Sequence, residues 1–324
     1  MDAIDRRRLL LALGGVLAVA PALAGALPSM VYDDPDDLYA ALRDKPSLSL
    51  PMTGGTIAVV FADDVPGVNR PKVLAWVRHA ARALTTYFGR FPVDHLGLLI
   101  IAEDSDKVGH ATTFGYAGSA IRIHVGMRAD DGALARDWVL VHEMMHAALP
   151  DLPRRALWLQ EGSATYLEPI ARTQAGELAV TEVWRQSLAG MPRGQPNAGE
   201  GGMDGTDAWG RLYWGGATFW LLAEVGIFEA TQGRGSLREA LRAINRASGG
   251  NSIEWSPEQM MQTGDMAVGG VTLATLYRRF ADQRIETDLY ALFARLGVVG
   301  RPDGAIAFDD SAPLARLRQR ITRA

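Results

Sequence analysis

The chain has 324 residues, of which 48% are hydrophobic and 22% are charged, and its mean hydropathy is close to zero. These values are typical of a globular protein with room for one large domain or two modest ones. The formal net charge of −4 argues against a nucleic-acid-binding protein, which would usually carry a basic surface. Cysteine is absent, which excludes disulfide bonds, thiolate metal ligands and a lipid-modified cysteine anchor.

Residues 1–24 have the features of a secretory signal peptide. A cationic group at 6–8 is followed by an apolar stretch over 9–20 and by an A-x-A pattern at 22–24. The apolar stretch is shorter than a membrane span, so we expect cleavage and no stable membrane insertion afterwards. We therefore expect export to a bacterial periplasm, and the arginines before the leucines are also typical of a twin-arginine signal.

Residues 25–131 are predicted to form a strand-containing N-terminal part of the molecule. It begins with a lead-in that carries one short helix near 37–43. Apolar, β-branched and alternating patterns predict strands at 56–61, 95–102 and 119–127. The segment 71–89 has Pro71 at its start, apolar residues at helical spacing and Gly89 at its end, which predicts a helix.

From residue 132 onward the pattern is helical. We divide this part into 132–172 and a C-terminal lobe over 173–324, and the glycine-rich stretch 190–210 is its clearest loop. Apolar residues at helical spacing predict helices at 132–149, 153–172, 177–189, 211–226, 236–247, 256–263, 271–283 and 287–297.

The stretch VLVHEMMHAALP (139–150) contains an H-E-x-x-H motif. Residues i and i+4 of an α-helix lie about 40° apart around the axis and about 6 Å along it, so His142 and His146 can bind one metal ion. Glu143 is offset by one residue, so its carboxylate can take a proton from a water molecule beside the metal. The apolar neighbours indicate a buried helix, in which an unpaired set of histidines would be costly. The alternative is a coincidental motif on a core helix.

A catalytic zinc ion needs three protein ligands and one open position. The segment LWLQEGSATYLE (157–168) offers Glu161 on a second helix, and the preceding PDLPRR turn would bring it back toward the histidines. Glu161 stands among apolar residues, where a carboxylate needs a cationic partner such as Zn²⁺. Its alternative role is a solvent-exposed carboxylate near the start of a helix. Glu168 is the reserve candidate for the third ligand.

The segments HEMMH and LWLQEGSATYLE resemble the H-E-x-x-H … W-x-x-E-G-x-A/T-x-Y pattern of gluzincin zinc metallopeptidases. The resemblance is to the aminopeptidase and glycyl aminopeptidase (peptidase MA-like) branches of that group. This resemblance implies that His142, His146 and Glu161 bind zinc and that Glu143 is the catalytic base. Residues 132–172 would then be the zinc-site helices.

The resemblance extends to RLYWGGATFWLLAE (211–224), which is similar to a Tyr-x-x-Gly-Ala helix start in the same families. It implies that Tyr213 stabilises the oxyanion of the tetrahedral intermediate; the alternative is one more aromatic side chain in a helix. A G-A-M-E-N sequence is absent, so the resemblance does not extend to that anchor for a free amino terminus. The connection from His146 to Glu161 is also shorter than in the classical aminopeptidases.

These patterns predict an α+β protein with a thermolysin-like metallopeptidase fold. A small, mainly antiparallel sheet would pack on the H-E-x-x-H helix, a mainly helical lobe would follow, and the cleft would lie between them. The expected function is an exported zinc metallopeptidase that hydrolyses peptide or protein substrates. One alternative is a catalytically degenerate relative that serves as a periplasmic binding or assembly protein. Such a relative would keep the fold, with or without the metal ion. The other is a structural helical protein with a coincidental motif.

The remaining histidines are weaker candidates. His79 is expected at the surface of a helix, and His95 and His110 lie on or near strands and loops. His124 would face a cleft only if its strand borders one. The C-terminal segment LARLRQRITRA (314–324) is interpreted as a solvated helix face, not as a nucleic-acid-binding arm.

Overall fold

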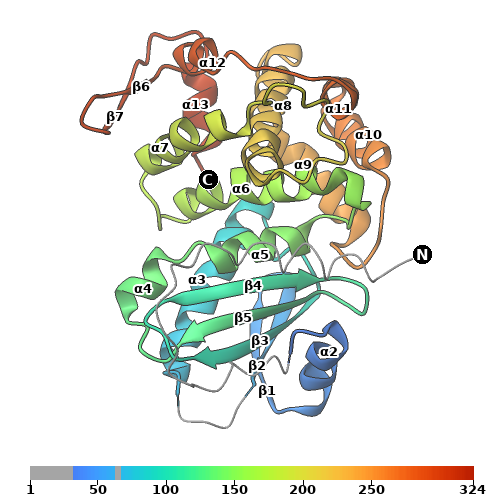
Figure 1. The fold of residues 1–324 in the computed structure, drawn as a ribbon, viewed down its shortest axis with the longest axis vertical. Helices are drawn as coiled ribbons and strands as arrows, with labels where there is room; N and C mark the ends of the chain where they lie inside the picture. Colours follow the sequence, from blue (N-terminus) through green and yellow to red (C-terminus); the bar gives the residue numbers. More distant parts are fainter. Residues whose placement is uncertain (1–31, 63–66) are drawn as a thin grey trace.

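The computed structural model describes residues 32–62 and 67–324, so the signal peptide predicted at 1–24 lies outside the described residues. A sheet with helices on both faces forms the lower half of the molecule in Figure 1, and a helical lobe lies above it. Within the described ranges, no helix combines the length and the apolar character that crossing a membrane requires.

The sheet has five strands in the order β1-β2-β3-β5-β4. Its strands are β1 (Ser47–Met52), β2 (Gly55–Phe61), β3 (His95–Glu103), β4 (Val108–Phe114) and β5 (Ala120–Gly126). The pairs β2–β3 and β3–β5 are parallel, whereas β1–β2 and β4–β5 are antiparallel. The strands predicted from sequence correspond to β2, β3 and β5, and β1 and β4 are additional.

The prediction of a mainly antiparallel sheet is therefore wrong, because the sheet is mixed. The helix α3 (Arg70–Phe88) leads from β2 to β3, and a crossover of this length lets consecutive strands run in the same direction. The strand β4 pairs only with β5 and forms one edge of the sheet.

Helices cover both faces of the sheet, and each strand contributes to both layers of packing, because successive side chains of a strand point to opposite faces. On β3, Leu96 and Leu98 belong to the main core together with residues of α3 and of the helix that carries the H-E-x-x-H motif, called the motif helix here. Leu99 belongs instead to a smaller cluster with Leu38, on the helix α2 (Pro35–Asp44). The motif helix thus lies between the sheet and the helical lobe (Figure 1).

The helices that follow the sheet occur close to the predicted positions. They are α4 (Asp131–Arg136), α5 (Val139–Ala148), η2 (Arg154–Ala156), α6 (Leu157–Gln174), α7 (Val180–Gly190), η3 (Met191–Gly194), η4 (Arg211–Gly215), α8 (Gly216–Ala230), α9 (Leu237–Ser248), α10 (Pro257–Val268), α11 (Thr272–Asp282), α12 (Leu289–Leu296) and α13 (Ala315–Ile321). The domain boundaries at 131 and 172 remain a prediction.

One predicted helix, 132–149, is broken in two. The backbone of Asp137 is extended, and its carboxylate accepts hydrogen bonds from the amides of Val139 (2.9 Å) and Leu140 (3.2 Å). Such a side chain supplies the partners that the first amides of a helix lack. The indole of Trp76 on α3 donates to the same carboxylate at 3.2 Å, which attaches the start of α5 to the core.

The C-terminal segment is not a solvated helix face. Leu317 and Arg318 on α13 are buried, and the Arg318 guanidinium donates to the backbone carbonyls of Leu296 and Gly297. Those carbonyls lie at the end of α12, just before the two-stranded sheet of β6 (Val298–Gly300) and β7 (Ile306–Phe308). This arginine therefore satisfies backbone acceptors inside the lobe. The sequence pattern instead predicts that it lies on a solvated face of the helix.

Candidate metal centre

The helix α5 presents the two histidines of the motif on one side and packs its other side into the core. Leu140 and Met144 are fully buried against the sheet and α3. His142 and His146 lie on the side toward α6, with 5% and 14% of their side chains exposed. The helical spacing read from the sequence thus places both rings together, with their centroids 4.9 Å apart.

The third candidate ligand comes from α6. After α5 ends, a short turn with two prolines leads through η2 into α6, which runs back past the histidines. Glu161 Oε2 lies 3.3 Å from His142 Nε2 and 3.5 Å from His146 Nε2. One ligand atom from each residue lies within 4.8 Å of the others, and no further group of this kind occurs among the described residues.

These spacings fit a tetrahedral zinc ion. Ligand atoms about 2.0–2.1 Å from such an ion are about 3.4 Å from one another. The two separations that involve Glu161, 3.3 Å and 3.5 Å, match that value, and all three donor atoms lie within 4.8 Å of one another. The donor set of two imidazole nitrogens and one carboxylate oxygen also suits zinc and leaves a fourth position for a water molecule or substrate.

The charge of Glu161 favours a role as ligand. Burial by itself would raise the pKa of Glu161, but the nearby His146 charge and the hydrogen bond with His142 hold it well below its usual range. Burial would likewise lower the pKa of His146, and the Glu161 carboxylate outweighs this and raises it. The carboxylate is therefore ionised, and a cation of either kind, proton or metal, is favoured between the three side chains.

Glu143 is held by a residue that the sequence did not single out. Thr113, on the edge strand β4, lies with its Oγ1 2.7 Å from Glu143 Oε2 and 2.9 Å from the Glu143 carbonyl oxygen. A single hydroxyl proton can serve one of these acceptors at a time. The sequence around Thr113 gives no sign of this role, because the strand β4 was not predicted. The contact also joins two elements, β4 and α5, whose packing cannot be read from the sequence.

Tyr213 lies in η4, a single π-helical turn directly before α8. Such turns occur often at functional sites, because the extra residue changes the direction of the side chains. Its ring stacks on that of His142, with centroids 5.8 Å apart and an interplanar angle of 11°. Burial and the negative charge of Glu161 raise the pKa of Tyr213, so that the phenol keeps its proton and can donate a hydrogen bond.

A close crossing of α6 and α8 joins these two parts of the site. A Cβ atom at Gly162 would lie 2.4 Å from backbone atoms of Gly216, so only glycine allows the helices to approach this closely. Gly162 directly follows Glu161 on α6, and Gly216 begins α8 just after the turn that carries Tyr213. The crossing therefore sets the position of the third candidate ligand, Glu161, relative to Tyr213.

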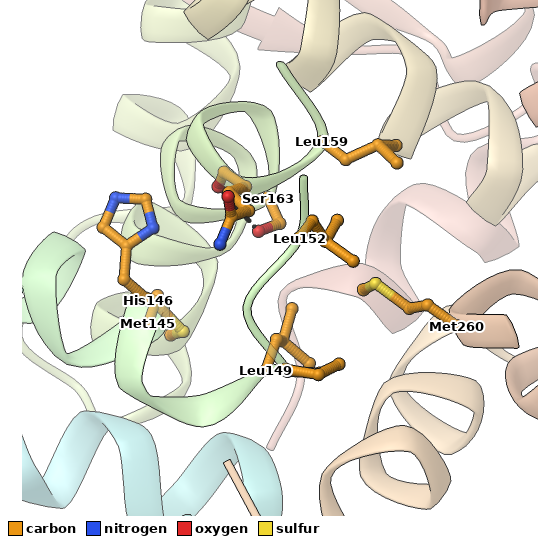
Figure 2. Close-up of a pocket in the computed structure, with 9 residues that line it drawn as sticks. Met145, His146, Leu149, Leu152, Leu159, Ser163 and Met260 are labelled. Carbon is orange, nitrogen blue, oxygen red and sulfur yellow. Dashed lines mark hydrogen bonds between the residues drawn. The ribbon is translucent and has the colours of Figure 1, made fainter. Parts of the chain in front are cut away.

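A small pocket lies next to the site, and His146 is one of the residues that line it. Figure 2 shows that apolar side chains close it, among them Leu152, Leu159 and Met260, and that the His146 ring stands at its border. Its cavity volume of about 10 Å³ is far below the ~300–1,000 Å³ typical of ligand pockets. It is therefore part of the packing between α5, α6 and α10 and not a place for a substrate.

The other candidates lie elsewhere. Glu168, the reserve ligand, is buried in an ion pair with Arg172 at 2.7 Å and does not belong to the metal-binding group. His124 stacks on His110 with ring centroids 4.0 Å apart, on the face of the sheet that is turned away from α5. His79 is exposed, as expected, and His95 is exposed at the start of β3.

The comparisons with known proteins found similar chains among solved structures only. No family model matches the chain, and no curated protein matches it. An aminopeptidase N family protein from Idiomarina loihiensis superposes with a TM-score of 0.54 at 10% identity, over 79% of this chain and 50% of that one. An M1 zinc metallopeptidase from Deinococcus radiodurans superposes with a TM-score of 0.47 at 15% identity, over 75% of this chain and 53% of that one.

The likeness to the Idiomarina protein shows the fold alone, because the identity is only 10%. The chain is a mixed α+β protein, and it spans about half the length of the solved structures that it matches. Finer agreement with a thermolysin-like arrangement remains a prediction.

Proposed function

We propose that the protein is a zinc-dependent metallopeptidase that hydrolyses peptide bonds. The observation that carries this proposal is the position of Glu161 Oε2, 3.3 Å and 3.5 Å from the Nε2 atoms of His142 and His146, which is close to the ligand spacing of tetrahedral zinc. Glu143 and Tyr213 stand beside this group, so an acid–base residue and a hydrogen-bond donor accompany it. This combination suits amide hydrolysis better than a purely structural metal site, which would fill all four positions with protein ligands.

When bound, zinc supplies a Lewis acid that polarises a carbonyl group and lowers the pKa of a water molecule. The protein's own residues move the protons. Glu143 takes a proton from the attacking water and delivers it to the leaving amine, while Thr113 keeps its carboxylate in position. Tyr213, which stays protonated, donates a hydrogen bond to the oxygen that becomes negative as the carbon turns tetrahedral.

The proposal is tested with Glu143→Gln, which keeps the size of the side chain and removes its basicity. We expect peptide hydrolysis to fall by about 10²–10⁴-fold, with one equivalent of zinc still bound by elemental analysis. The matched control is Glu286→Gln, at a side chain that is 69% exposed and far from α5 in the chain, and it should keep full activity. Full turnover in Glu143→Gln would refute the assignment of the base.

The metal site is tested separately with His146→Ala. We expect this variant to lose the equivalent of zinc that the unmodified protein carries, because two ligands bind the ion far more weakly than three. Zinc bound by the unmodified protein, together with no hydrolysis of a peptide library with or without chelator, would favour the degenerate binding protein. No bound zinc at all would favour a coincidental motif.

Export is part of the proposal and rests on the sequence of residues 1–24. We expect the mature protein to begin soon after Ala24. The intact mass of the protein isolated from its native cells measures this directly, and an uncleaved amino terminus would contradict it.

A further inference from the structure

The tryptophans of this protein separate into two groups. The chain has eight, and all of them lie in the described residues. Trp138 and Trp209 are 50% and 45% exposed, and the other six are buried or half-buried. Half-exposed indole rings place large apolar surfaces in water, so their position in the fold is informative.

Both exposed tryptophans lie at the candidate metal centre. The Trp138 ring packs edge-to-face on His142, with centroids 5.5 Å apart. The Trp209 ring stacks on Tyr213 at 5.1 Å, and Tyr213 in turn stacks on His142 at 5.8 Å. The four rings thus form a continuous row, with the exposed indoles at its two ends and the metal-binding imidazole between them.

The two indoles come from unrelated elements. Trp138 directly precedes the first turn of α5, and Trp209 lies two residues before the first residue of the π-helical turn η4. Neither is needed to fill the core, because about half of each side chain is in contact with water. Their link to the same imidazole, direct for Trp138 and through Tyr213 for Trp209, is therefore a feature of the site and not of the packing of either helix.

We propose that Trp138 and Trp209 recognise bulky aromatic or aliphatic side chains of a peptide substrate on either side of the scissile bond. This inference rests on the proposed peptidase function and adds the class of substrate. Trp138 contacts the ring of the zinc ligand His142 directly, and Trp209 is linked to it through Tyr213. An extended peptide advances about 3.3 Å per residue. Side chains next to a bond held at the metal are thus within reach of the rings, and indoles bury large apolar areas at low entropic cost.

The test uses two fluorogenic peptides that differ only in the residues flanking the scissile bond, phenylalanine in one and alanine in the other. We expect the zinc-loaded protein to prefer the phenylalanine peptide by at least about tenfold in kcat/KM. Trp138→Ala and Trp209→Ala should each bring this ratio down toward one, and Trp209→Phe should keep most of it. Tyr290→Ala, at an 88% exposed aromatic on α12, is the matched control and should leave the ratio unchanged.

A wild-type ratio near one, or a ratio that neither alanine variant changes, would overturn the substrate assignment while leaving the peptidase function intact. If the protein cleaves neither peptide, the proposed function fails and the binding assignment is tested by itself. Indole fluorescence of zinc-loaded Glu143→Gln is then titrated with each uncleaved peptide. Tighter binding of the phenylalanine peptide that is lost with the added Trp209→Ala supports the assignment, and equal or absent binding overturns it.

Discussion

Replacement of Gly162 by alanine tests how closely the crossing of α6 and α8 controls the site. The added Cβ would lie 2.4 Å from the Cα and carbonyl carbon of Gly216, and 2.9 Å from the amide nitrogen of Ala217. Ordinary contact begins at 3.4 Å, so the two backbones would have to separate by 3.4 Å less 2.4 Å, or about 1.0 Å. Backbone atoms cannot rotate out of the way, unlike the end of a flexible side chain.

We expect such overpacking to cost about 1–3 kcal/mol. The better helix propensity of alanine offsets about 1 kcal/mol of this, which leaves a net loss of at most about 2 kcal/mol in the free energy of unfolding. The effect on activity should be larger, because Glu161 directly precedes Gly162 and would move relative to Tyr213. A misplacement of about 1 Å lowers a rate by about 10²-fold.

The measurements are thermal unfolding and kcat/KM of the zinc-loaded proteins. Gly226→Ala is the control, because Gly226 lies on α8, the other helix of the crossing, and its Cβ would meet no backbone atom but only the Thr272 side-chain methyl group, at 2.7 Å. The Thr272 methyl group must move aside, which offsets the gain in helix propensity, so that variant should change stability by less than about 1 kcal/mol and keep its activity. A Gly162→Ala protein with wild-type melting temperature and wild-type kcat/KM would show that the close crossing does not hold the site.

Three further predictions concern single groups. Tyr213→Phe removes the donor to the oxyanion, and steady-state kinetics should show kcat about 10²-fold lower with zinc content unchanged. Thr113→Val keeps the side-chain shape and removes the hydrogen bond to Glu143, so kcat should fall about tenfold, the equivalent of one charged hydrogen bond. Burial raises the pKa of Glu224 from 4.5 to about 7, so its contribution to stability is complete below about pH 4.5 and is lost as the pH rises through about 7. Glu224→Gln cannot titrate, and its melting temperature should depend less on pH across that range.

Each of these has a contrary result. Loss of zinc from Tyr213→Phe would mean that the ring supports His142 instead of the reaction. A raised KM with unchanged kcat in Thr113→Val would mean that this hydroxyl contacts the substrate and does not orient Glu143. An undiminished pH dependence in Glu224→Gln would assign the titration to another buried acid such as Glu168, whose pKa burial also raises to about 7.

Much of the fold could be predicted because its signals are local. Helix α3 begins with an asparagine cap and a proline and ends at Gly89 in a left-handed conformation, and these residues mark its ends in the sequence. The strands β2, β3 and β5 are apolar and were found. The strand β4, with its two threonines, glycine and histidine, has no such pattern, and its place at the edge depends on pairing with β5.

The sequence by itself determined the identities of the candidate metal-binding residues. His142 and His146 are one helical turn apart, and any helix at that position brings them together. Glu161 could be proposed because a carboxylate among apolar residues requires a partner. These inferences depend on spacing along one chain segment and on the cost of burying charge, both of which can be read without coordinates.

Only the tertiary structure decided how these residues are held and what surrounds them. The close approach of Gly162 to Gly216, the contact of Thr113 with Glu143 and the row of rings from Trp138 to Trp209 all join separate elements. Such contacts depend on how helices and strands pack, and packing is set by the whole core and not by the neighbours of a residue in the sequence.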